Sequence, residues 1–232
     1  MSMIHLKSEE RGAMKASWLD TRYSFSFNRY YNPDRMGFRS LRVMNEDVIK
    51  GGGGFAEHPH NNMEIITIVL SGALAHKDSM GTGSVIRAGD VQKMSAGDGV
   101  THSEFNASQD EPCHLFQIWI LPDTQDIAPS YEQVKIDEEA AQKRFALIGG
   151  EKSDTSVSIH QDARLYWGTP EAGAVFTHAF DENRFGYLHV VDGSIEVDGQ
   201  TLQSGDALEL EGVRDLKITA QSDATLMLFD LG

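Results

Sequence analysis

Cysteine is almost absent from the sequence, since Cys113 is the single cysteine among 232 residues. A disulfide within the chain is therefore excluded, and such a chain suits a reducing compartment. Long hydrophobic runs are also missing: no stretch of about 18 apolar residues occurs, and the first residues lack the apolar centre of a signal peptide. We therefore expect a cytoplasmic protein without a membrane span.

Basic residues are scarce relative to acidic ones. The chain has 20 Lys and Arg against 35 Asp and Glu, which gives a formal net charge of −15. Nucleic acids and anionic membranes would repel such a surface, so direct binding to either is not expected. A protein partner with a basic face remains possible, as does a small-molecule ligand.

Glycine, in contrast, is abundant, with 22 residues placed between short runs of Val, Ile, Leu and Phe. Many short strands separated by turn residues are typical of an all-β sandwich or barrel. Helical periodicity is weak except in residues 137–146, where a short helix or a linker is expected.

One structural plan occurs twice along the chain. Strand, glycine turn, strand, hairpin, strand and Gly-Asp follow one another around Gly72 and Gly89, and again around Gly193 and Gly205. The repeat predicts two related antiparallel β-barrels packed together. We place the N-terminal barrel at residues 1–136, a polar linker at residues 137–153, and the C-terminal barrel at residues 154–232.

Two short segments carry the residue types of a metal site. His58 and His60 flank Pro59, and side chains two apart on a strand point to the same face. The same spacing puts His102 and Glu104 on one face of a second segment. If the two segments are walls of one barrel, three imidazoles and a carboxylate converge, a set that suits Fe, Mn, Ni, Cu or Co with open positions. A closed structural zinc site is less favoured because no thiolates are near.

Spacing leaves the identity of the carboxylate open. Glu64 follows His60 by four residues with the same parity, so it is an alternative to Glu104 as a ligand or a partner of a ligand. His76 lies near a hairpin and is expected to be a hydrogen-bonded turn residue. In the register of the repeat, the ligand positions of the second half hold Ala179, Asp181, Ile218 and Ala220, so one metal per chain is predicted.

Aromatic residues are concentrated before the first metal motif. We expect them to supply core packing and packing between the barrels rather than a ligand pocket. They are Trp18, Tyr23, Phe25, Phe27, Tyr30, Tyr31 and Phe38.

These segments together resemble the pirin family of the cupin superfamily, in particular its bacterial members. The resemblance covers nearly the whole chain and is densest over residues 17–121. The segments that carry it are Ser17-Trp-Leu-Asp20, Ser24-Phe-Ser-Phe27, Tyr31-Asn-Pro-Asp34, Phe55-Ala-Glu-His-Pro-His60, His76-Lys-Asp-Ser79, His102-Ser-Glu104 and Gln117-Ile-Trp119.

The resemblance implies a bicupin, with two double-stranded β-helix (jelly-roll) domains and metal only in the N-terminal one. Its ligands fall on His58, His60, His102 and Glu104, and Fe(II) is the expected ion, with Mn, Ni, Cu, Co or Zn as alternatives. General cupin motifs would place the carboxylate at Glu64 instead.

The activity implied is that of a quercetin 2,3-dioxygenase, which opens the flavonol heterocycle with O2 and releases CO. In this hypothesis Glu104 is the general base that takes the proton of the flavonol 3-hydroxyl. Two alternatives remain open: a non-enzymatic pirin that responds to metal or redox state and binds a protein partner, and an enzyme that acts on another enol or phenol.

Overall fold

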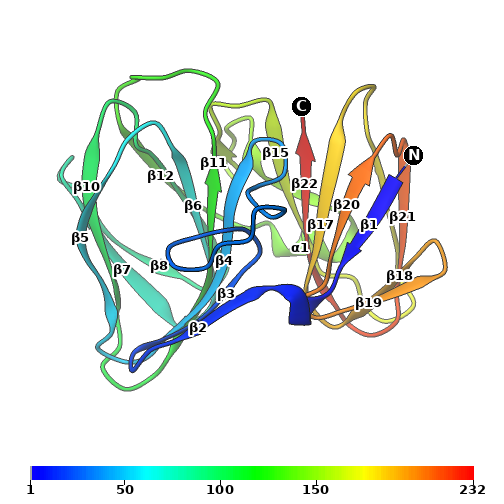
Figure 1. The fold of residues 1–232 in the computed structure, drawn as a ribbon, viewed down its shortest axis with the longest axis horizontal. Coiled ribbons are helices and arrows are strands. Elements are labelled where there is room, and N and C mark those ends of the chain that lie inside the picture. The colour runs from blue at the N-terminus through cyan, green and yellow to red at the C-terminus, as the bar shows by residue number, and fades with distance from the viewer. Residues whose placement is uncertain (1) are drawn as a thin grey trace. The chain divides into compact units, whose positions relative to one another are not determined.

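The computed structural model describes residues 2–232, and almost all of its regular structure is β-strand (Figure 1). The helical elements among these residues are α1 (Glu138–Lys143) and the short 3-10 turn η1 (Ser8–Glu10). The Asp137 side chain caps α1 by accepting a hydrogen bond from the Ala140 backbone N–H at 2.9 Å. The predicted all-β class is confirmed. Neither helix is long and apolar enough to cross a membrane.

The contacts within the described chain form two compact units. The first consists of Arg11–Lys135 and Val157–Gln161, and the second of residues 2–10 together with Ile136–Ser156 and Asp162–Gly232. Each half of the chain thus contributes a short segment to the unit built mainly by the other half. The sequence-based boundaries at residues 137 and 153 remain a prediction.

The first unit has two antiparallel sheets. The larger sheet has the strand order β12-β9-β6-β11-β4-β3-β2, and the smaller one has the order β5-β10-β7-β8. The strands are β2 (Gly12–Lys15), β3 (Leu19–Tyr23), β4 (Leu41–Ile49), β5 (Gly54–His60), β6 (Glu64–Ser71), β7 (Ala73–Asp78), β8 (Gly83–Arg87), β9 (Asp90–Ser95), β10 (Val100–Asn106), β11 (Cys113–Ile120), β12 (Ser130–Lys135) and the short β14 (Val157–Ser158).

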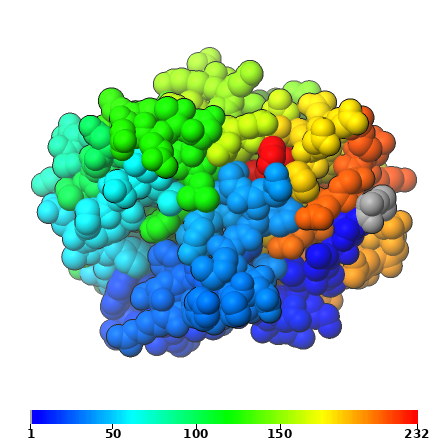
Figure 2. Space-filling view, turned by 45° about the horizontal axis from the view of Figure 1, so that its top comes forward, coloured from blue at the N-terminus to red at the C-terminus, as the bar shows by residue number. Residues whose placement is uncertain are grey.

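The second unit repeats this construction. Its larger sheet runs through β1-β20-β17-β22-β15-β13, and its smaller sheet has the order β16-β21-β18-β19. The strands are β1 (Ser2–Leu6), β13 (Ala146–Gly150), β15 (Ala163–Gly168), β16 (Val175–Ala179), β17 (Phe185–Asp192), β18 (Ser194–Val197), β19 (Gln200–Gln203), β20 (Ala207–Glu211), β21 (Asp215–Ala220) and β22 (Thr225–Leu231). Residues of β1, dark blue, adjoin the orange residues of β20 on the surface (Figure 2).

The repeated strand plan predicted from the sequence is present in both units. β6, β7, β8 and β9 follow one another as β17, β18, β19 and β20 do, and Gly72 and Gly193 occupy the same turn with φ of +77° and +83°. Glycine is needed there because positive φ strains a residue with a Cβ. The two sheets of each unit do not close into one continuous barrel over the described residues, so the barrel and jelly-roll detail is not confirmed.

The two interiors differ in polarity. A large apolar cluster of the second unit contains Leu188, Leu208 and Leu228, each completely buried. Smaller apolar clusters of the first unit lie around Leu115 and around Ile65. Buried polar side chains lie on the larger sheet of this unit. The candidate site lies between this sheet and strands β5 and β10 of the smaller one, since residues of both sheets line its pocket.

Candidate metal centre

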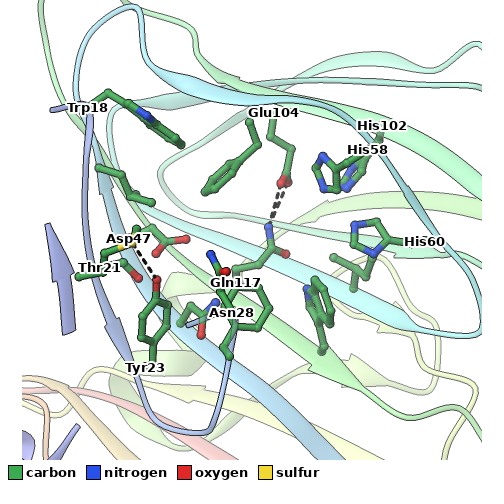
Figure 3. A pocket seen from close by; sticks show the side chains of 17 residues that line it. Trp18, Thr21, Tyr23, Asn28, Asp47, His58, His60, His102, Glu104 and Gln117 are labelled. Carbon is green, nitrogen blue, oxygen red and sulfur yellow. Dashed lines mark hydrogen bonds between the residues drawn. The ribbon is translucent and has the colours of Figure 1, made fainter. Parts of the chain in front are cut away.

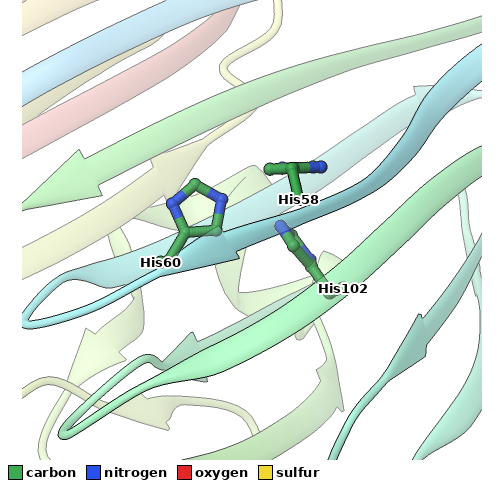
Figure 4. Close-up of side chains that lie close together, drawn as sticks. All are labelled: His58, His60 and His102. Atoms are coloured by element: carbon green, nitrogen blue, oxygen red, sulfur yellow. The ribbon is translucent and has the colours of Figure 1, made fainter.

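Three histidines meet where β5 pairs with β10. His58 and His60 project from the same face of β5, and His102 lies directly opposite His58 on β10. The ring centroids are 4.8 Å apart for His58 and His60, 4.5 Å for His58 and His102, and 4.9 Å for His60 and His102 (Figure 4). One nitrogen of each ring lies within 4.8 Å of the others, so the three rings could hold one metal ion.

Glu104 follows His102 past a β-bulge in β10, because His102 pairs with His58 while Glu104 pairs with Phe55. Its carboxylate is buried and belongs to a second, overlapping group of possible ligands, together with His102 and His76. The amide Nε2 of Gln117 donates to both carboxylate oxygens, at 3.1 and 3.0 Å. In turn, the Thr67 hydroxyl donates to Gln117 Oε1 at 3.3 Å. Gln117 therefore fixes the orientation of Glu104.

His76 joins the cluster from β7, opposite Glu104 on β10. Its Nε2 donates to the Asp78 carboxylate at 3.1 Å, so the hydrogen bond expected for this residue is present. The side chain is not a turn residue at the surface, however: it is buried, and its ring centroid lies 5.3 Å from that of His102. A fourth imidazole facing the cluster was not expected, because His76 has no second histidine two residues away to mark a ligand pair.

Burial dominates the electrostatics of the cluster. It lowers the pKa of His60 to about 4 and that of His102 to about 2, with smaller contributions from the neighbouring imidazoles. These rings are therefore neutral at physiological pH and offer lone pairs, as metal ligands must. Burial also raises the pKa of Glu104 to about 7, against the lowering effect of the Gln117 amide. A nearby cation would favour its ionised form.

The hydrogen bonds around the rings fit a metal ion. His58 Nδ1 donates to the Ala56 carbonyl at 2.8 Å, which leaves Nε2 with a free lone pair. Both ring nitrogens of His102 are buried and have no hydrogen-bond partner among residues 2–232. Unpaired buried polar atoms are costly, on the order of 1–3 kcal/mol each, and coordination would satisfy one of them.

A pocket of about 260 Å³ opens beside the cluster (Figure 3). His58, His60, His102 and Glu104 lie at one end, and aromatic rings form much of the wall. The aromatic and polar residues that line it are Trp18, Thr21, Tyr23, Phe27, Asn28, Asn45, Asp47, Phe55, Gln117 and Trp119.

This pocket corrects the expectation that the early aromatic residues serve packing alone. Trp18, Tyr23 and Phe27 line the pocket, and the Phe27 ring contacts Trp119 edge to face at 5.4 Å. Phe25 and Phe38 are buried as expected, whereas Tyr31 is exposed. The sequence spacing did not reveal this role because Trp18 lies just before β3, Tyr23 lies in β3 and Phe27 lies in the loop after it, and no strand period connects these positions to the histidine segments.

Glu64 does not join the cluster. Its carboxylate is buried, accepts from Ser95 Oγ at 3.1 Å, and lies 3.2 Å from both the backbone nitrogen and Nδ1 of His160. The parity argument fails because residues 61–63 separate β5 from β6, with Asn62 at a φ of +45°, so the alternation of one strand does not continue into the next. Ile65, the next residue, is the one that faces the pocket.

In the second unit, the positions that correspond to the ligands hold no comparable group among the described residues. Ile218 and Ala220 are buried apolar residues of β21. His178 on β16 pairs with Asp230 at 2.9 Å, and Asp230 also binds Arg184. The groups capable of holding a metal within residues 2–232 both lie in the first unit.

Comparison with known proteins agrees with this construction. Residues 6–120 match the pirin family, and residues 147–231 match the quercetinase C-terminal cupin domain. The chain is 42% identical to quercetin 2,3-dioxygenase of Escherichia coli strain K12, over 99% of both chains. It is 38% identical to a pirin-like protein of Caulobacter vibrioides, over 96% of both.

A solved structure extends the likeness to three dimensions. The bacterial pirin YhhW of Escherichia coli, in complex with nickel(II), superposes with a TM-score of 0.94 at 39% identity, over 99% of both chains. The two halves share one construction, the first half has the histidine cluster, and the relatives match along the full length of the chain. The chain therefore belongs to the pirin family.

Proposed function

We propose that this protein is a metal-dependent dioxygenase that opens the heterocycle of a flavonol with O2 and releases CO. The observation that carries the proposal is the location of the pocket: a cavity with aromatic walls ends directly at three clustered imidazoles and a carboxylate. The names of its relatives, which include quercetin 2,3-dioxygenase, support the same reaction.

We propose His58, His60, His102 and Glu104 as the ligands of one divalent cation. Fe(II) is the ion we favour, and the nickel(II) complex of a related pirin supports a site for a transition metal of this kind. A cation held by these four residues would supply positive charge that favours the deprotonated 3-hydroxyl of the substrate. His76, held by Asp78, lies behind His102 and Glu104 and supports the ligand end of the pocket.

Glu104 is the general base of the proposed reaction. Burial raises the pKa of its carboxyl to about 7 in the protein without a metal, and a bound cation would lower this pKa, so the ionised carboxylate can accept the proton of a substrate hydroxyl at neutral pH. The Gln117 amide holds both carboxylate oxygens and so keeps the base aimed at the pocket. The rings of Trp18, Phe55 and Trp119 contact a flat substrate and exclude water from the reacting end.

Substitution of a ligand tests the proposal. We expect His102→Ala to lose bound metal and quercetin turnover together, because its imidazole is central to both groups of ligand atoms. Mass spectrometry measures the bound metal, and loss of the flavonol absorption band measures quercetin turnover. His114→Ala, which removes a partly exposed histidine paired with Glu46, is the matched control and should keep both. Full turnover by metal-free His102→Ala protein would refute the mechanism.

A further inference from the structure

A row of buried polar side chains crosses the larger sheet of the first unit. Residues directly opposite one another on neighbouring strands share a face, and the pairing runs from Gln92 to Thr67, from Thr67 to Gln117 and from Gln117 to Asn45. All four are at most 8% exposed. Asp47 follows on the same face of β4, opposite Thr21 on β3.

The second unit shows that the fold itself does not need this polarity. The same row there pairs Leu208 with Leu188, Leu188 with Leu228, and Leu228 with Tyr166. Thr67 and Leu188 each precede the shared turn glycine by five residues, so the two rows correspond. By the same pairing, Asp47 corresponds to Gly168. Buried polar side chains stabilise the fold less than leucine side chains would at the same positions. We therefore look for a function that explains why the first unit has polar residues there.

Gln117 has its function in holding Glu104, but Asn45 and Asp47 do not contact that carboxylate by any hydrogen bond. Both line the pocket and are 3% and 4% exposed. Asn45 Oδ1 has no hydrogen-bond partner in the described part of the chain. Asp47 has the Thr21 hydroxyl beside it, and a carboxylate can accept several more hydrogen bonds than that.

Asp47 lies at the end of the pocket away from the histidines, and Asn45 lies two residues from it on the same face of β4, beside Gln117. Figure 3 shows Asp47 and Thr21 on one side and His58, His60 and His102 on the other, with Gln117 between them. A ligand that reaches both ends must therefore be elongated. The aromatic wall between the ends favours flat rings, since ring faces and edges pack well against one another.

We propose that Asn45 and Asp47 form a hydrogen-bond-accepting subsite for a hydroxyl group on the distal ring of a polyhydroxylated aromatic substrate. Asn45 Oδ1 and the Asp47 carboxylate are acceptors, and the Thr21 hydroxyl beside Asp47, which has no hydrogen-bond partner among the described residues, can donate to that carboxylate. The group that matches Asn45 and Asp47 is therefore a donor, and a phenolic hydroxyl is the donor that a flat aromatic ligand carries. This inference rests on the proposed flavonol chemistry and goes further, because it assigns the ring that the ligand presents to the second end of the pocket.

The test compares two flavonols that differ by one hydroxyl. Galangin and kaempferol share the same fused rings, and only kaempferol has a hydroxyl on the distal ring. Affinity is measured by quenching of tryptophan emission in Fe(II)-loaded protein without oxygen, since Trp18 and Trp119 line the pocket. We expect kaempferol to bind about tenfold more tightly than galangin, as a hydrogen bond to a charged acceptor is worth that much or more.

Leucine, which is nearly isosteric with Asn and Asp, separates recognition from folding. Asn45→Leu and Asp47→Leu should abolish the preference for kaempferol, leave galangin binding in place and keep or raise the melting temperature of the free protein. The control is Glu46→Leu, the intervening residue of β4, which pairs with Arg11 on the other face. That variant should keep the preference.

Each other outcome is informative. Equal affinity of the wild-type protein for the two flavonols would overturn the subsite while leaving the proposed function intact. An undiminished preference in both leucine variants would do the same. If neither flavonol binds at all, the proposed function itself fails and the subsite fails with it.

Discussion

Gln117 is the residue on which the geometry of Glu104 depends most directly. Its Nε2 donates to both carboxylate oxygens, while its Oε1 is held by Thr67. Partners that orient a metal ligand are worth about 10- to 100-fold in metal affinity. The Gln117 amide thus holds the Glu104 carboxylate in a position that the larger sheet determines.

We predict that Gln117→Leu weakens metal binding by about 10- to 100-fold, because Glu104 loses both hydrogen bonds and its ionised form is less favoured. Competition with a chromophoric chelator measures the affinity. The matched control is Gln92→Leu, which changes the same residue type in the same polar row without touching Glu104. Equal affinities of the two variants would contradict the role assigned to Gln117.

At the level of single residues, the sequence predicted three of the clustered imidazoles, since His58, His60 and His102 lie in pairs with strand spacing. It did not predict His76, which reaches the cluster through the pairing of β7 with β10. Nor could it reveal Gln117 or Asn45, because their positions depend on a register between strands distant in sequence.

Among the elements, β5 and β10 pack tightly against one another at the site. Gly54 on β5 lies against β10 so tightly that a Cβ would come within 2.5 Å of the Glu104 backbone oxygen and 2.4 Å of the Phe105 ring. This contact brings the strand of His58 and His60 onto the strand of His102. The bulge between His102 and Glu104 lies next to it.

Gly54→Ala should therefore push β5 away from β10, lower the melting temperature by several degrees and weaken metal binding. Gly83→Ala on β8 is the control, since a Cβ there meets nothing within 4 Å and the same sheet is involved. Removing a glycine at a compatible site is neutral or stabilising by about 0.4–1 kcal/mol. Thermal unfolding without metal measures the stability of each variant, and the increase in melting temperature on adding metal measures its metal binding. A Gly54→Ala protein as stable as Gly83→Ala would show that the close approach is unimportant.

The succession of strands and turns along each half followed from the glycine-punctuated repeat, and the elements occur as predicted around Gly72 and Gly193. The direction of the Glu64 side chain was not predicted correctly. Side chains alternate between faces only within one strand, and this alternation ends at the turn after His60. A pattern two residues long is reliable inside β5 or β10 and uninformative across residues 61–63.

For the whole molecule, buried carboxyl groups make stability depend on pH. Burial raises the pKa of Asp47 from 3.8 to about 6. Between these values the folded state binds more protons than the unfolded state, so stability falls as pH rises through this window. Above it, the ionised group costs on the order of 3 kcal/mol relative to acidic conditions.

We predict that Asp47→Asn removes this cost, so its advantage over the wild-type protein grows from pH 4 towards pH 7. Urea unfolding of chelator-treated protein across this range measures the difference. Asp20→Asn is a control of opposite sign: its pKa is lowered by the hydrogen bond from Lys15, so its ionised form is favoured in the folded state. A pH profile of Asp47→Asn parallel to that of the wild-type protein would show that Asp47 is not the cause.

The two halves have the same fold but differ in the residues that fill their interiors. The interior of the second unit is rich in leucine, whereas the first unit has a row of buried polar side chains, four candidate metal ligands and a pocket. The most direct measurement is the stoichiometry of the reaction in protein loaded with Fe(II) under anaerobic conditions and then given quercetin and air. We predict that one O2 is consumed and one CO is released for each quercetin lost, and that metal-free protein is inactive. Quercetin loss without CO, or at the same rate in metal-free protein, would contradict the proposal.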